Sequence, residues 1–486
     1  MGERSPETAG PPRPPGDGHA RHGQRTDWLD AVVLVHLGVM IVGTSWAFGG
    51  QAPGVRTWLA AWGGIGIALL LVAWAKKELN HPAERASPLR DLWPLLLLDL
   101  CVGLSCFNPT FQKVVRDGAA YFVLTDPRWP GLPSTARPDL TWPALWLLNG
   151  IVASAYNTSL AVQRRRSLRL LLAGVVANAV LLAIFGTFQK LARSEGLWFG
   201  LVASPQNYFF STFVYHNHWG AFTLLNLAAC LGLLFDFGRH GGHRDPWHSP
   251  VFATAVGALL LAAAVPLSGS RSSSALACLF LFGALVHFLV QLVRRRREHR
   301  ESFVLPVAGI ALGAVVALAA VLYLGRDVIR QRATLTVEQV GRIRAEDRLD
   351  TRLVLYRDTW RMAMDRPLFG WGLDTYGDVF RIYNSQRSTE GWTPYYREAH
   401  NDWFQWLAET GFVGTALLGL LVGVPLARAP WRGSRSPLPL YLLAGCGLVL
   451  LYAAFEFPFA NPSVVIGFWT SLFVARRYLV LDARPT

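Results

Sequence analysis

The sequence predicts an all-α, polytopic integral membrane protein with about twelve transmembrane helices and one long helical loop on the outer side. Hydrophobic residues make up 52% of the 486 residues and charged residues only 16%, below the roughly 25% charged residues of an ordinary soluble protein. Apolar stretches long enough to cross a hydrocarbon layer of ~30 Å recur along the chain. A large soluble catalytic domain is therefore excluded.

The chain divides into four parts. Residues 1–27 are rich in Pro, Gly and Arg and hold no apolar run, so we expect a disordered tail. No cleavable signal peptide is expected before the first span. The next parts are nine spans within 28–325, an outer loop or cap at 326–400, and three spans with a short tail at 401–486. The expected spans are approximately 28–50, 56–75, 90–108, 140–162, 168–190, 210–235, 250–268, 273–293, 303–324, 403–426, 438–456 and 461–480.

Basic residues are unevenly divided between the two sides of these spans. If the first tail is cytoplasmic, 25 of the 46 Lys and Arg residues fall on the cytoplasmic side and 8 in the short outer loops. The positive-inside rule then places both termini in the cytoplasm. The net charge of +14 is thus explained by membrane topology, and no nucleic-acid partner is expected.

The long outer segment before the tenth span is rich in Trp, Tyr and Arg, which favours an ordered, binding-competent cap. Apolar residues recur there at helical spacing at Leu353, Tyr356, Trp360 and Met364. This spacing predicts an amphipathic helix. A proline ends it, and the following Phe-Gly-Trp-Gly-Leu at 369–373 predicts a tight turn. A dinucleotide site is excluded because no strand precedes the turn and the third glycine is missing.

Polar residues open the span that follows the cap. His400 lies at the expected membrane-water boundary, and either Asn401 or Asp402 is suited to cap the helix. Asp402, Gln405 and Glu409 fall on one helical face, so we expect this stripe to face a water-filled cavity. The alternative is a capped helix whose histidine is solvated at the interface.

Arg271 lies in Ser-Gly-Ser-Arg, between two spans joined by almost no loop. An unpaired guanidinium held at the outer membrane face would be costly, and a phosphate suits its planar fork. The alternatives are a snorkelling arginine or one paired with Glu409 or Glu456. Asp99, near the middle of a span, is either a functional acid or a helix-packing residue.

Tyr215-His-Asn-His-Trp219 begins the sixth span on the outer side, and its two histidines raise the possibility of a metal site. Such a site would need a third ligand, from His400 or Glu409, and the chain contains no HExxH motif. We therefore expect no metal and no cofactor. Asn217 and His218 are expected to line the outer cavity through hydrogen bonds.

Four of these features follow one another in a characteristic order. They are Phe213-Val-Tyr-His-Asn-His-Trp-Gly-Ala221, Ser268-Gly-Ser-Arg271, Arg352 ahead of Pro367-Leu-Phe-Gly-Trp-Gly372, and Ala399-His-Asn401 followed by Glu409-Thr-Gly-Phe-Val-Gly414. Together they resemble the O-antigen ligase and polymerase superfamily of bacterial membrane glycosyltransferases. The resemblance spans about residues 170–425. Tyr215 departs from it, since that pattern commonly has Asn there, and the first four spans carry no matching motif.

The resemblance implies transfer of a glycan from an undecaprenyl-diphosphate carrier to an acceptor sugar hydroxyl, at the periplasmic face of the bacterial inner membrane. The acceptor would be a lipid-anchored or free glycan, and the carrier's tail would lie among membrane lipid. Arg271 and Arg352 would stabilise the diphosphate leaving group, and His400 would act as general base. Such a reaction needs no metal and inverts the anomeric centre. Glu409 would orient His400 or contact the acceptor, and Tyr356 would stack on sugar or bond to phosphate.

Two alternatives remain open. A polymerase that extends a glycan on its own carrier uses the same donor chemistry as a ligase that moves a finished chain to the lipid A-core of lipopolysaccharide. A secondary transporter also commonly has about twelve spans with both ends inside. The polar candidates cluster at one outer face, whereas transporters concentrate them near the bilayer midplane.

Overall fold

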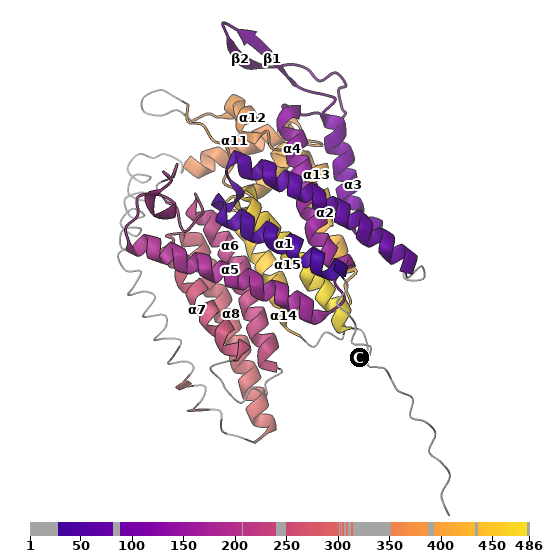
Figure 1. The fold of residues 1–486 in the computed structure, drawn as a ribbon. Helices are drawn as coiled ribbons and strands as arrows, with labels where there is room; N and C mark the ends of the chain where they lie inside the picture. Colours follow the sequence, from indigo (N-terminus) through magenta and orange to yellow (C-terminus); the bar gives the residue numbers. More distant parts are fainter. Residues whose placement is uncertain are drawn as a thin grey trace, which may run out of the picture.

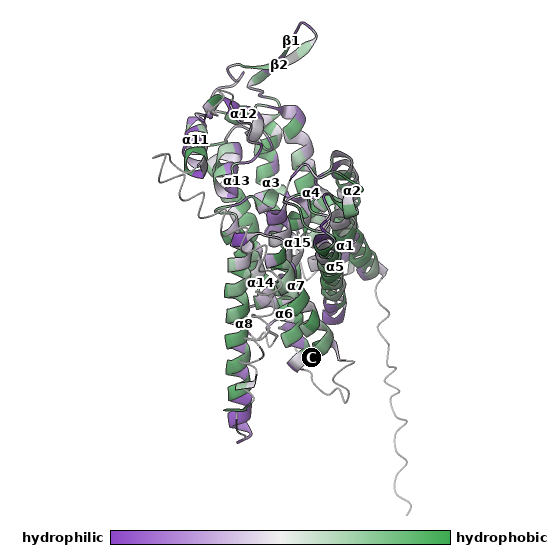
Figure 2. Ribbon diagram, turned by 90° about the vertical axis from the view of Figure 1, so that its left-hand side faces the viewer, coloured by the Kyte–Doolittle hydropathy of each residue, from purple (hydrophilic) through white to green (hydrophobic). Residues whose placement is uncertain are grey.

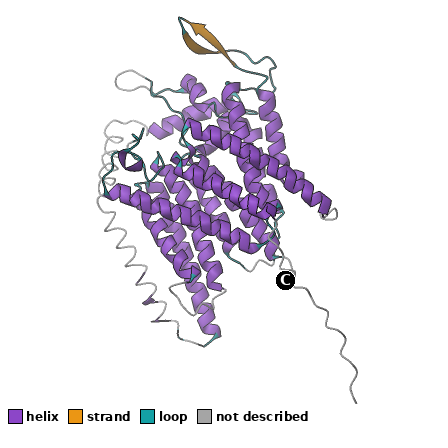
Figure 3. Ribbon diagram, in the orientation of Figure 1, coloured by secondary structure: helices purple, strands orange, loops and turns teal. Residues whose placement is uncertain are grey.

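The computed structural model describes residues 28–80, 88–206, 208–239, 249–300, 351–386, 393–432 and 436–483, with isolated positions between 302 and 313. These residues form a bundle of long helices with a small helical cap and a β-hairpin at one end (Figures 1 and 3). The helices are α1 (Trp28–Trp46), α2 (Pro53–Asn80), α3 (Pro88–Ser105), α4 (Pro138–Leu160), α5 (Arg165–Leu191), α6 (His216–Arg239), α7 (Pro250–Leu267), α8 (Arg271–Glu298), α11 (Thr351–Asp365), α12 (Tyr376–Tyr383), α13 (Asp402–Ala427), α14 (Leu438–Tyr452) and α15 (Pro462–Asp482). Three short 3-10 turns, η1 (Phe48–Gly50), η2 (Trp198–Gly200) and η3 (Pro458–Ala460), join them.

The all-α membrane fold is confirmed. Eleven of the twelve expected spans coincide with a helix, while the tail at 1–27 and, apart from isolated positions, the ninth span at 303–324 lie outside the described residues. Eight of the described helices are long and apolar enough to cross a membrane: α1, α2, α5, α6, α7, α8, α13 and α15. The helix α14 is apolar but shorter, and α3 carries Arg90, Asp91 and Asp99.

One element was not predicted from the sequence, an antiparallel hairpin of β1 (Phe111–Arg116) and β2 (Ala119–Leu124). Its turn residues Asp117 and Gly118 both have positive φ, as a tight two-residue hairpin turn requires. The hairpin projects from the same end of the bundle as α11 and α12 (Figure 1).

The opposite end of the bundle is basic. The last turns of α8 carry Arg294–Arg297, and Figure 2 shows this hydrophilic tip far from the cap, across a largely apolar stretch of helices. The cap and the basic tip therefore mark the two ends of the membrane-crossing bundle.

The helix α6 occupies the centre of the bundle. It packs against α5, α7, α8, α14 and α15, and nearly all of its side chains from His216 to Leu233 are buried. Because α6 begins at His216, the Tyr-His-Asn-His-Trp motif lies at its first turn. The site described below is built around this turn.

The predicted cap helix is present as α11, but the expected buried face is wrong. Leu353 is 55% exposed and Trp360 is 45% exposed, although both belong to the predicted apolar stripe. The buried face instead includes Asp358 and Thr359, whose polar groups bond to Ser385 and to the hydroxyl of Tyr376. Hydrogen bonds pay for burying these polar residues, so hydrophobicity alone selects the wrong side.

Asp99 has a partner on the neighbouring helix. The amide nitrogen of Asn149 on α4 donates to its carboxylate at 2.8 Å, and also reaches the carbonyl of Leu145 at 3.0 Å. This contact links α3 to α4 within the bundle, as expected of a helix-packing residue.

A loop of the cap is inserted into a break in α13. The helix is interrupted at Gly411, where φ is 64° and ψ is −174°. On one side of the break, the amides of Trp371 and Gly372 donate to the carbonyls of Ala408 and Glu409 at 2.9 and 2.8 Å. On the other side, the amide of Phe412 donates to the carbonyl of Pro367 at 2.7 Å, and that of Val413 to the carbonyl of Leu368 at 3.1 Å.

Glycines of two motifs, Phe-Gly-Trp-Gly at 369–372 and Glu-Thr-Gly at 409–411, make this insertion possible. A Cβ on Gly411 would lie 2.3 Å from the carbonyl oxygen of Leu368, and one on Gly370 would lie 2.4 Å from Glu409. Gly370 and Gly372 also have positive φ, at 69° and 108°, a region that side chains disfavour. The two motifs therefore pack together and connect the cap to the bundle.

We expect Gly411→Ala to destabilise the protein by about 3 kcal/mol, because the methyl group strains a left-handed residue and meets fixed backbone. Thermal unfolding in detergent measures the effect. Gly423→Ala, on the same helix, is the control, since a Cβ on Gly423 has no neighbour within 4 Å. Equal unfolding temperatures for the two variants would show that the inserted loop does not depend on Gly411.

Candidate functional site

A buried carboxylate lies at the centre of the candidate site. Glu456 follows α14 and is only 2% exposed. One of its oxygens accepts a hydrogen bond from Nη2 of Arg352 at 2.7 Å. The other lies 3.4 Å from the hydroxyl of Tyr215, which donates to it, and 3.7 Å from Nδ1 of His400. Glu456 thus joins the cap, the start of α6 and the segment before α13.

Arg352 and Glu456 form an ionised pair. Burial alone would raise the pKa of Glu456, but His400 and Arg352 outweigh burial and hold this pKa below its ordinary value. Burial likewise opposes the charge on Arg352, yet Glu456 raises the pKa of Arg352. The guanidinium also donates to the carbonyl of Phe455 at 3.1 Å. Its side chain remains 42% exposed.

A hydrogen bond to its backbone and contact with an aromatic ring fix the position of His400. Its φ is 52°, an uncommon conformation for a residue with a side chain. The hydroxyl of Tyr356 donates to its carbonyl at 2.9 Å, and its ring meets Phe457 edge-on at 4.6 Å between centroids. The 3.7 Å between Nδ1 and Glu456 is an ion-pair distance and is long for a hydrogen bond.

Asn401, of the two residues suited to cap α13, is the cap. Its side-chain oxygen accepts from the amide of Phe404 at 3.1 Å, and its amide nitrogen donates to the carbonyl of Ala454 at 2.8 Å. Asp402 is buried beneath it, where its carboxylate accepts from the amide of Phe459 at 2.9 Å. Both residues fix the start of α13 against the turn that carries Glu456.

The start of α6 packs around the same carboxylate. Asn217 donates to the hydroxyl of Tyr215 at 2.7 Å, and the ring of His218 lies edge-on to Phe457 at 5.0 Å. Asn217 is 8% exposed and His218 is 3% exposed. Both are therefore buried beside the Glu456 cluster, which consists of Glu456, Arg352, Tyr215 and His400. Tyr215, the departure from the family pattern, supplies a contact of its own to Glu456.

Arg271 begins α8 at the same end of the bundle and is exposed. The hydroxyl of the preceding Ser270 lies 3.2 Å from that of Tyr452, at the end of α14 and one turn before Glu456. Of the two acids considered as partners for Arg271, Glu456 pairs with Arg352.

Glu409 bonds to the backbone of the cap. Its carboxylate accepts from the amides of Asp374 and Tyr376 at 3.0 and 3.1 Å, at the start of α12, and from Gln405 at 3.4 Å. A carboxylate at a helix N-terminus satisfies free amides and is favoured by the helix dipole. The carboxylate beside the imidazole of His400 is that of Glu456, so the role of orienting His400 falls to Glu456, and contact of Glu409 with the acceptor stays a prediction.

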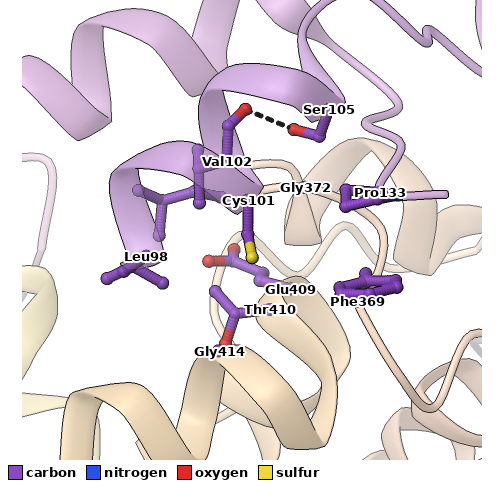
Figure 4. Close-up of a pocket in the computed structure, with 11 residues that line it drawn as sticks. Leu98, Cys101, Val102, Ser105, Pro133, Phe369, Gly372, Glu409, Thr410 and Gly414 are labelled. Carbon is purple, nitrogen blue, oxygen red and sulfur yellow. Dashed lines mark hydrogen bonds between the residues drawn. The ribbon is translucent and has the colours of Figure 1, made fainter. Parts of the chain in front are cut away.

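Glu409 also borders a small gap between α3, the inserted loop and the broken part of α13. Figure 4 shows Cys101 and Val102 of α3 facing Glu409 and Thr410, with Phe369 at the side. This gap has a volume of about 10 Å³, which is room for one water molecule at most. It is a packing gap and holds no substrate.

The expected polar stripe does face a cavity. Asp402, Gln405 and Glu409 line a space of about 630 Å³ between α13, α15, α4 and α2. In the part of the chain that the structure describes, the wall of this space includes neither Asn217 nor His218. The sequence predicted that all these residues line one outer cavity. The structure instead places Asn217 and His218 beside the Glu456 cluster and Asp402, Gln405 and Glu409 on the wall of this separate space.

The two histidines at the start of α6 point to different neighbours. Nδ1 of His216 lies 3.1 Å from the carbonyl of Tyr208, while His218 packs on aromatic rings. Within the described ranges, no group of three or more His, Cys, Asp or Glu side chains is arranged to hold a metal ion.

Sequence reasoning missed Glu456 as a functional residue and considered it only as a partner for Arg271. The signal was present, because Phe455-Glu-Phe-Pro-Phe459 places one acid among aromatic residues between two apolar spans. A charge at such a position is costly unless it is paired. The cost of an unpaired charge, which singled out Arg271 as a candidate, therefore singles out Glu456 as well.

We expect Glu456→Gln to lower the free energy of unfolding by about 1–3 kcal/mol, because the buried pair loses its anion. Since the pKa of Glu456 is below its ordinary value of 4.5, its contribution is complete above that value and is lost as the pH falls through the lowered pKa. The deficit of the variant should thus be equal at about pH 8 and about pH 6. Chemical or thermal unfolding measures it.

The exposed Glu195, in the loop after α5, supplies the matched control Glu195→Gln, which should be neutral. If both variants unfold alike, the Glu456 cluster does not stabilise this end of the bundle.

Comparison with known families gives one match. Residues 256–419 match the family described as O-antigen ligase. This region begins in α7 and ends within α13, so it contains Arg271, Arg352 and His400, while Glu456 lies beyond it. A comparison with curated proteins gave no match.

Proposed function

We propose that this chain, whose residues 256–419 match the O-antigen ligase family, transfers a glycan from an undecaprenyl-diphosphate carrier to an acceptor sugar hydroxyl. The observation that carries this proposal is the Glu456 cluster, in which one carboxylate lies beside both an arginine and a histidine of the matched region. A glycosyltransferase of this kind needs a cation for the leaving group and a base for the acceptor.

The arginines would bind the donor's diphosphate. Arg352 has a partly exposed side chain, and Arg271 begins α8 at the same end of the bundle. When the bond from the anomeric carbon to the diphosphate breaks, the electron pair leaves with the phosphate oxygen. Fixed guanidinium groups stabilise that growing negative charge, and we propose that they do so without a divalent cation.

His400 would act as the general base. Its Nδ1 faces the carboxylate of Glu456, which favours the proton on Nδ1 and leaves Nε2 to accept the proton of the acceptor hydroxyl. The hydroxyl oxygen then attacks the anomeric carbon from the side opposite the diphosphate. One bond forms as the other breaks, and the anomeric configuration is inverted.

The supporting residues have proposed roles that follow from their contacts. Tyr356 fixes the backbone of His400 through its hydroxyl, and Asn401 and Asp402 anchor the start of α13. Asn217 and His218 pack behind Tyr215. Glu409 holds the loop before α12, so we propose a positioning role for it.

The proposed setting is the bacterial inner membrane, with the cap in the periplasm and both termini in the cytoplasm. The basic end of α8 on the side away from the cap supports this orientation through the positive-inside rule. The tail of the carrier would then lie beside the bundle with its diphosphate at the outer interface.

The polymerase alternative shares this donor chemistry and differs in the acceptor. Deleting the gene in its host and examining the surface glycan separates the two. We expect lipid-linked polymer to accumulate beside an intact lipid A-core, as for a ligase. Accumulation of single lipid-linked repeat units would indicate a polymerase instead. A transporter is disfavoured by the family match and by the pairing of Asp99 with Asn149.

His400→Ala should lower the turnover rate by about 10²–10⁴-fold, because the acceptor hydroxyl loses its base. Donor binding should stay close to that of the unaltered protein, since the arginines remain. Purified protein in nanodiscs, with undecaprenyl-diphosphate-linked glycan and acceptor, allows both quantities to be measured. Loss of binding together with continued turnover of bound donor would show that His400 is not the base.

Arg352→Lys and Arg271→Lys should each lower kcat/KM by about tenfold or more, because lysine keeps the charge but loses the planar fork. Arg116→Lys is the control, as Arg116 is exposed on the hairpin at the same end of the molecule. The same transfer assay applies. Full activity in either lysine variant would remove that arginine from the diphosphate site.

A further inference from the structure

A second site is available in the cavity of about 630 Å³ between α2, α4, α13 and α15. Its volume lies within the range of about 300–1,000 Å³ of pockets that bind small molecules. Of the residues that the structure describes, its wall includes none of Arg352, His400 and Glu456. The cavity is thus separate from the proposed diphosphate site and needs its own explanation.

The outer part of this cavity is rich in carboxyl groups. Asp374, Glu398, Asp402 and Glu409 all reach its wall. The one cation among the described residues of the wall is Arg56, whose Nη1 lies 3.7 Å from the carboxylate of Asp374. The positive charge of Arg56 is therefore already balanced by the carboxylate of Asp374. A diphosphate placed in this part would be surrounded mostly by carboxyl groups, which do not stabilise its negative charge.

Burial changes what two of these acids can offer to a ligand. It raises the pKa of Asp374 and the pKa of Glu398, because desolvation penalises their charged forms. A neutral carboxyl group both donates and accepts hydrogen bonds. Gln405, which donates to Glu398 at 2.8 Å, adds an amide to the same wall. Such groups suit the hydroxyls of an uncharged sugar.

The inner part of the cavity is apolar and lies at the depth of the membrane helices. Its wall is formed by Leu147, Leu148, Leu418, Val465, Phe468 and Trp469. Trp403 and Trp406, on the first turns of α13, also line the cavity. Indole rings combine an apolar face with a polar edge and are common at membrane-water boundaries. The polarity of the wall therefore changes along the cavity as it does along a glycolipid.

We propose that this cavity binds an amphiphile that has a hydrocarbon chain and an uncharged, hydroxyl-rich glycosyl head. Identifying this ligand as the acceptor glycolipid rests on the proposed function. Asp402 supports that identification, because it lines the cavity while its amide donates to the carbonyl of Ala453 at 2.9 Å and of Glu456 at 3.3 Å. The two sites thus share the first residues of α13.

The binding test uses a photoreactive dodecyl maltoside with a diazirine in its chain and the full-length protein in phosphatidylcholine nanodiscs. Mass spectrometry of the labelled protein locates the adducts. We expect adducts on the cavity-facing residues of α4, α13 and α15, and displacement by unlabelled dodecyl maltoside. Dodecyl phosphate, which has the same chain and an anionic head, should compete about tenfold less well.

A pair of variants on α13 tests the location. A Cβ on Gly419, which lines the cavity, has no neighbour within 4 Å, and the same is true of Gly423 one turn further on, outside the described wall. Gly419→Leu should reduce labelling about tenfold by filling the apolar part, whereas Gly423→Leu should leave it unchanged. The competition in the unaltered protein needs no variant and decides the question if either variant fails to fold.

Two results would overturn the inference. Adducts spread evenly over the lipid-facing helices, or unchanged in Gly419→Leu, would show that the cavity does not hold the probe. Displacement by dodecyl phosphate as strong as by dodecyl maltoside would show that the head group is wrongly assigned. His400→Ala should label normally, so continued glycan transfer by this variant with retained labelling would count against the proposed reaction alone.

Discussion

The arrangement of the cap end of this protein depends on burying one carboxylate. Glu456 is almost fully enclosed, and an unpaired charge in that position would cost several kcal/mol. The chain meets this cost with an arginine from the cap, a tyrosine from the start of α6 and a histidine from the segment before α13. Three segments far apart in the sequence are thereby brought to one point. The same contacts that stabilise the fold set the distance between the proposed cation and the proposed base.

A second constraint connects this point to the rest of the cap. The Phe-Gly-Trp-Gly loop fills the break in α13, and backbone hydrogen bonds run from it to both halves of the helix. An open break within an apolar span would leave amides and carbonyls without partners. Because the loop supplies them, the first turns of α13 can carry polar residues on two sides, toward the Glu456 cluster and toward the large cavity.

The sequence predicts the helices well because apolar length is a strong signal in membrane proteins. Eleven of the expected spans match helices, and the glycines of the inserted loop were correctly expected to form a tight turn. The partners of the polar residues were harder to predict. Glu409 and Glu456 both lie at the outer end of apolar spans, and only the three-dimensional path of the cap decides which of them reaches His400. The hairpin after α3 and the buried face of α11 were missed for a related reason, since hydrogen bonds rather than hydrophobicity determine them.

The most direct test of the account is an experimental structure with undecaprenyl diphosphate bound in a lipid nanodisc. The account requires the phosphate oxygens to lie within hydrogen-bond distance of Arg352 or Arg271, on the outward side of the Glu456 cluster, with the imidazole of His400 facing the same space. Phosphates found instead in the carboxyl-rich cavity beside Asp374, with Arg352 still closed on Glu456, would contradict it.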